Sequence, residues 1–99
     1  MNDTVQLAYV DNTVLSVHSS PRGAAVALVE DARTRMKRHD KTLDDAEHAI
    51  LVDVLVRESV LNLNQGRSMT SCAIPTERMT IIAMHVNRQM AIEPSMVLD

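Results

Sequence analysis

Aromatic side chains are almost missing from this sequence: Tyr9 is the only one, and there is no Phe or Trp. Because aromatic residues bury the most area per side chain, the core has to be built from Val, Ile, Leu, Ala and seven Met. Such a core is thin for 99 residues, and small domains with thin cores often gain stability by associating. We therefore expect one domain, residues 1–99, that forms a homodimer.

Cysteine and glycine are nearly as scarce, with one Cys and two Gly. The single Cys72 excludes an internal disulfide and a cysteine-based zinc site, which is typical of a reducing compartment. Gly23 and Gly66 are too far apart for a glycine-rich phosphate loop. The chain begins without the basic and apolar stretches of a signal peptide, and no apolar run reaches the roughly 20 residues of a membrane span. We expect a soluble, cytoplasmic protein that does not bind membranes.

The pattern of apolar residues predicts an α+β domain with elements in the order ββααββ. Val5, Leu7 and Tyr9 alternate on one face of a strand, and Asp11-Asn12 after it is suited to a hairpin turn. We expect a mainly antiparallel sheet with two helices packed on one face. Its four strands are predicted at residues 5–10, 13–18, 68–74 and 78–86.

The first helix is predicted to begin at Ser20-Pro21, since Ser caps helices well and Pro at the first helical position loses no hydrogen bond. One apolar stripe follows at helical spacing. It contains Ala25, Leu28, Val29, Ala32 and Met36.

The second helix is predicted to begin at a capping box of Thr42 and Asp45 and to end at Gly66. Two apolar stripes run along it, and we expect both to be buried, one on the sheet and one on the first helix or another chain. A buried strand over the valine-rich residues 49–56 is the alternative. The stripes are Leu43, Ile50, Val54 and Leu61, and Ala49, Val52, Val56, Val60 and Leu63.

The second stripe and the apolar tail, residues 87–99, supply the candidate protein interface. The tail is unusually apolar for a chain end and is expected to dock on the domain or on a partner. The candidate interface residues are Val52, Val56, Val60, Leu63, Met90 and Met96.

Two arrangements resemble a nucleophile beside a base. If Thr76-Glu77 is the tight turn of the last hairpin, Cys72 and His85 lie four positions apart along it, about 13 Å, which is too far for a dyad. His18 precedes two serines, but no glycine-flanked nucleophile elbow is present, so a helix cap is the simpler interpretation.

Charged clusters offer two further sites. Asp44, Asp45 and Glu47 with His48 have helical metal-ligand spacing, but acidic residues at a helix start also offset the helix dipole, so no metal site is predicted. The basic stretch is a candidate nucleic-acid contact, although no aromatic lies near to stack on bases and the net charge is −3. It consists of Arg33, Arg35, Lys37, Arg38 and Lys41.

These observations predict a non-enzymatic protein that presents a surface to another protein and to itself, with no cofactor. Its target is hypothesised to be a host complex, as for a small phage or mobile-element inhibitor of the anti-CRISPR kind, or it is an accessory factor. The alternative is a small nucleic-acid-associated regulator that uses the basic stretch. A more remote alternative is a small enzyme whose site is shared between subunits and uses His18, His48 or His85.

Overall fold

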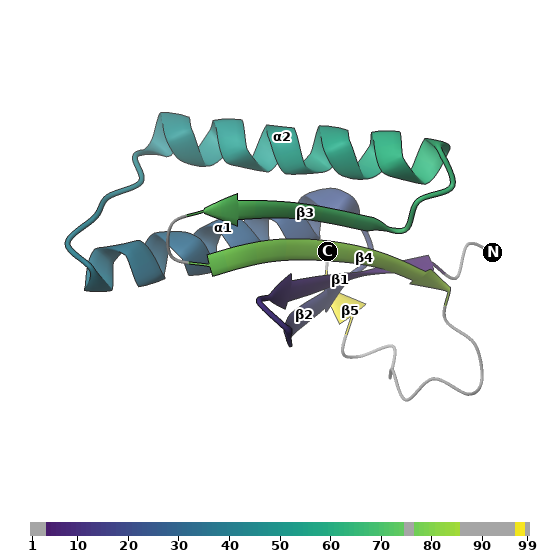
Figure 1. Cartoon of the computed structure of the whole chain (residues 1–99), viewed down its shortest axis with the longest axis horizontal. Coiled ribbons are helices and arrows are strands. Elements are labelled where there is room, and N and C mark those ends of the chain that lie inside the picture. Colours follow the sequence, from purple (N-terminus) through teal and green to yellow (C-terminus); the bar gives the residue numbers. More distant parts are fainter. Residues whose placement is uncertain (1–3, 75–76, 86–96, 99) are drawn as a thin grey trace.

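The computed structural model describes residues 4–74, 77–85 and 97–98 (Figure 1). Five strands form one sheet in the order β3-β4-β1-β2-β5, antiparallel except for the short β2-β5 pair. The predicted α+β fold and ββααββ order are confirmed, with β5 as an additional strand. The elements are β1 (Thr4–Val10), β2 (Thr13–His18), α1 (Pro21–Arg38), α2 (Asp45–Asn64), β3 (Met69–Ile74), β4 (Glu77–His85) and β5 (Val97–Leu98).

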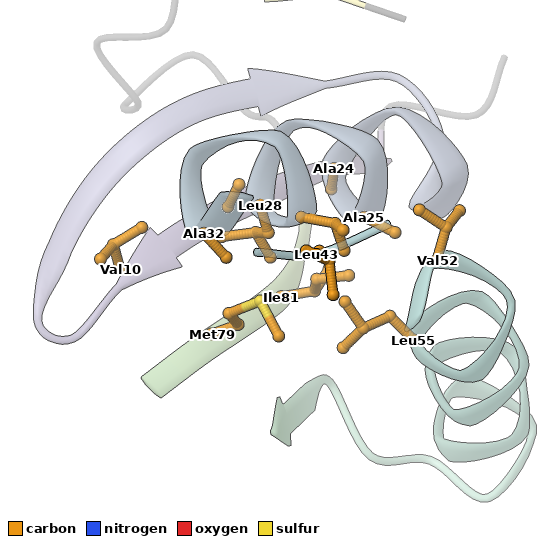
Figure 2. Close-up of a cluster of buried hydrophobic side chains, with 12 residues drawn as sticks. Val10, Ala24, Ala25, Leu28, Ala32, Leu43, Val52, Leu55, Met79 and Ile81 are labelled. Atoms are coloured by element: carbon orange, nitrogen blue, oxygen red, sulfur yellow. The ribbon is translucent and has the colours of Figure 1, made fainter. Parts of the chain in front are cut away.

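Both helices pack on one face of the sheet, as the sequence predicts. Figure 1 shows α1 behind the sheet and α2 alongside β3, with which it is in contact. Every second residue of β1 and β4 points toward the helices, which is the alternation of a strand covered on that side. Figure 2 shows the resulting core, which includes Val10, Ala24, Ala25, Leu28, Ala32, Leu43, Val52, Leu55, Met79 and Ile81.

The opposite sheet face carries a second apolar cluster. Val5, Leu7 and Val17 are buried there, and Tyr9 packs against them. The predicted common face of Val5, Leu7 and Tyr9 is therefore confirmed. Ile82 and Val97 join the cluster, so β5 contributes to this face through its side chain as well as through its pairing with β2. The rest of the predicted tail docking, including Met90 and Met96, falls on residues outside the described ranges.

The helix starts follow from local hydrogen bonds. Ser20 Oγ accepts from the Gly23 N–H at 3.1 Å, so the predicted start of α1 is confirmed. The start of α2 was placed two residues too early. Asp44 is its cap, accepting from the Glu47 N–H at 2.8 Å, while Glu47 Oε1 accepts from the Asp44 N–H. Gly66, at φ 77°, follows the last turn as expected.

The register of the β3-β4 hairpin differs from the predicted one by two residues. Ile74 pairs with Glu77 and Cys72 with Met79, whereas the predicted register centres the turn on Thr76-Glu77. Proline favours the first central position of a turn, and the predicted register leaves Pro75 outside the turn. The observed register increases the separation of Cys72 from His85 along the hairpin to six positions, about 20 Å.

Candidate functional site

The buried face of α2 is centred on residues that neither predicted stripe contains. Leu55 is 1% exposed and Ser59 is 3% exposed, with Val52 buried beside them. The sheet and α1 therefore bury neither stripe as a whole, and the expected burial of one stripe against another chain stays a prediction. The helix α2 packs against both β3 and α1. Its residues between the two stripes therefore point toward these two elements and into the core. Asn62, one turn after Ser59, donates through Nδ2 to the Met69 carbonyl oxygen at 3.3 Å and fixes this orientation.

Three of the four residues of the first predicted stripe lie on the outside of α2, whereas Leu43, which precedes the helix, is buried in the core. Ile50 is 61% exposed, Val54 37% and Leu61 48%. At 100° per residue these three side chains fall within about 40° of one another and point away from Leu55 and Ser59. We call Ile50, Val54 and Leu61 the outer stripe. Three large apolar side chains aligned on one exposed helix face are unusual for a surface that contacts only water.

A shallow groove of about 540 Å³ runs beside the outer stripe, between α2 and the first turn of α1. An ion pair crosses it, with Arg22 Nη2 3.3 Å from Asp53 Oδ1. Both side chains are exposed, so this pair contributes little to stability. The groove is lined by Arg22, Asp53, Val56, Arg57, Val60, Leu61 and Asn64.

The predicted interface residues are divided by this geometry. Val56 and Val60 line the groove, and Leu63 is exposed near the end of α2. Val52 is part of the core, so its side chain is not accessible in the folded domain. The candidate set also omitted the outer stripe, although its spacing is visible in the sequence. The sequence signal for the buried face was the spacing of Leu51 and Leu55, which place two large apolar side chains on one side of the helix.

The basic stretch is not assembled into one patch. Arg33 Nη2 lies 2.9 Å from Asp45 Oδ1 and faces α2. Arg35 Nε lies 3.0 Å from Asp31 Oδ2 and 3.5 Å from Glu77 Oε2, toward the sheet. Lys37, Arg38 and Lys41 are exposed and have no ion-pair partner in the described part of the chain. Two of the five predicted contacts are therefore engaged within the domain.

A buried acidic group lies where β4 begins. The Glu77 side chain is fully buried, and burial raises the pKa of its carboxyl. Asp31, facing it from α1, and Asp11, from the β1-β2 turn, raise the pKa further, while Arg35 opposes them. Asp11 also ties its turn to β4, because its Oδ1 accepts from the Arg78 N–H at 3.0 Å. The cluster links α1, β4 and this turn.

The histidines that could support catalysis have separate structural partners. His18 is buried, and its Nε2 lies 2.6 Å from Ser16 Oγ on the same strand. His48 Nε2 lies 2.7 Å from Glu30 Oε1. Glu30 is about 15 Å along α1 from Ser20, which follows the end of β2 at His18 by two residues, so His18 and His48 do not converge within one chain. The His85 side chain lies outside the described part.

The acidic residues at the start of α2 each have a different role. Asp44 and Glu47 cap the helix, and the backbone N–H of Glu47 lowers the pKa of the Asp44 carboxyl. Asp45 pairs with Arg33 instead. No group of three His, Cys, Asp or Glu side chains suited to a metal ion occurs in the described ranges. Within the same ranges, no helix combines the length and apolarity that crossing a bilayer requires.

Comparisons with known proteins give no further identification. No protein-family model matches the chain, and neither the curated proteins nor the solved structures include a significant match to it.

Proposed function

We propose that this protein is a non-enzymatic protein-binding module whose binding surface is the outward face of α2. The surface consists of the outer stripe, Ile50, Val54 and Leu61, and the groove beside it. The observation that supports the proposal most strongly is the exposure of these three aligned side chains on a rigid helix whose opposite face is buried. Helix faces of this kind are recognised through apolar anchors three, four or seven residues apart, and the outer stripe has spacings of four and seven.

A second apolar surface competes for this role. Three exposed apolar side chains, Val14, Met69 and Met84, lie on the sheet face away from the helices. Their face follows from their strand partners Tyr9, Ile82 and Val5, which all belong to the apolar cluster on that side. The three exposed side chains come from three different strands and surround side chains that are already packed together. The outer stripe has no such packing, and it borders a groove with charged side chains at its rim. A polar rim around an apolar centre is the usual form of a protein interface.

The target of this surface is proposed to be a protein complex of the host cell, as for a phage or mobile-element inhibitor or an accessory factor. A cytoplasmic location is part of the proposal, because the chain has a single cysteine and so no internal disulfide. The nucleic-acid alternative would depend mainly on Lys37, Arg38 and Lys41, since Arg33 and Arg35 are held in ion pairs.

The test is affinity capture of the tagged protein from a bacterial lysate, with and without nuclease, read by mass spectrometry. We expect a protein partner that survives nuclease and is lost with Ile50→Asp. The matched control is Ala49→Asp, which adds the same charge at another exposed position of α2, about 100° around the helix from Ile50. Loss with both variants would show a general charge effect and contradict the proposal. Recovery that vanishes with nuclease would support the nucleic-acid alternative.

A further inference from the structure

We propose that the outer stripe binds the same stripe of a second copy, with the two α2 helices antiparallel about a two-fold axis. This inference rests on the proposed binding surface and names a second copy of the chain, in place of a host protein, as the occupant of the outer stripe. The apolar residues lie at positions 50, 54 and 61, and Arg57 completes the spacing of four, three and four residues. That spacing forms a continuous seam along one side of a helix, as in helix pairs that pack with small crossing angles.

The antiparallel register follows from the position of the two largest apolar residues. When Ile50 of one copy lies opposite Leu61 of the other, the two-fold axis repeats the contact, so the Ile50–Leu61 pair occurs twice along the seam. Val54 then lies opposite Arg57, whose long aliphatic stem can cover it while the guanidinium reaches outward. Every exposed side chain of the outer stripe thereby gains a neighbour, and no residue of the buried face has to move.

Charge complementarity argues for a second copy and for this direction. In the same register, Arg57 of one copy lies beside Asp53 of the other. Arg57 has no ion-pair partner in the part of the chain that the structure describes. A parallel pair would instead place the acidic starts of the two helices together, which is unfavourable. Antiparallel helix dipoles add to the same preference.

The test uses cysteines introduced on the seam in a Cys72→Ala background. The double variant Ile50→Cys/Leu61→Cys should form an intermolecular disulfide under mild oxidation, at least about tenfold more efficiently than either single variant. In the antiparallel register, position 50 of one copy is about 16 Å from position 50 of the other, beyond disulfide reach. A cysteine pair within one chain is separated by the same distance, so the double variant cannot close on itself. Val60→Cys with Ile50→Cys is the off-seam control.

The possible results separate this inference from the proposed function. Disulfide formation by Ile50→Cys alone, equal to that of the double variant, would indicate a parallel or random encounter and would overturn the antiparallel pair. A wild-type protein that sediments as a monomer at all concentrations, with no seam cross-link, would overturn self-association. The proposed function would still stand in that case if captured partners were lost with Ile50→Asp. If neither self-association nor stripe-dependent capture were found, both would fail.

Discussion

Replacing Leu55 by Ala tests which face of α2 is buried. Leu55 is 1% exposed and projects from α2 into the buried cluster that contains Met79 and Ile81 (Figure 2). Removing most of a buried leucine side chain loses its transfer free energy and leaves a cavity, and costs about 3 kcal/mol. A domain of this size has a total free energy of unfolding of about 5–15 kcal/mol, so the loss is a large share of it.

Leu61→Ala is the matched control, since it deletes the same atoms from the outer stripe. Leu61 is 48% exposed, so we expect a change within about 0.5 kcal/mol. Thermal unfolding followed by circular dichroism separates the two cases. Leu55→Ala should lower the Tm by about 12–24 °C, and Leu61→Ala by no more than about 4 °C. The measurement is made at low protein concentration, because association would add to the apparent stability.

Two results would refute the reasoning. If Leu61→Ala destabilised the dilute protein as much as Leu55→Ala, the outer stripe would be part of the core and not a free surface. A small effect of both would mean that α2 contributes little to the fold. Either outcome would remove the structural basis for the proposed binding surface.

Other predictions concern the buried acid, the helix cap and the basic stretch. The pKa of Glu77 is raised in the folded state above its ordinary value of 4.5. Between these two pKa values the folded protein keeps a proton that the unfolded chain releases, so the free energy of unfolding falls as the pH rises from one to the other. Glu77→Gln should flatten this fall in urea titrations at several pH values; an unchanged slope would show that Glu77 is not its source. Ser20→Ala should cost about 1 kcal/mol in the same titrations, and Ser19→Ala much less, because only Ser20 caps α1. Exchanging Lys37 and Arg38 for Glu should leave nuclease-resistant capture unchanged, and loss of capture would implicate the basic stretch.

The strands and the first helix could be predicted from local signals. The alternation of Val5, Leu7 and Tyr9 and the cap at Ser20 act over a few residues, so tertiary contacts did not alter them. The short β5 could not be predicted, because a two-residue strand has no periodicity of its own and exists only by pairing with β2.

The buried face of α2 was harder to predict because apolar residues surround much of the helix. Ser59 and Asn62 are polar, yet one is buried and the other bonds to β3, so hydrophobicity alone places the centre wrongly. The hairpin register failed for a related reason, since a shift of two residues keeps the same side chains on each face. The candidate site inherited the first error: its residues were taken from the flank of α2, and the outer stripe was left out.

Hydroxyl-radical footprinting of the purified protein and of its captured or concentrated assembly tests the central claim most directly. Mass spectrometry of the labelled peptides reports which side chains lose solvent access when the protein associates. We predict protection of Ile50, Val54 and Leu61, with labelling of Met69 and Met84 unchanged. Protection confined to Met69 and Met84 would move the binding surface to the open sheet face and contradict the account.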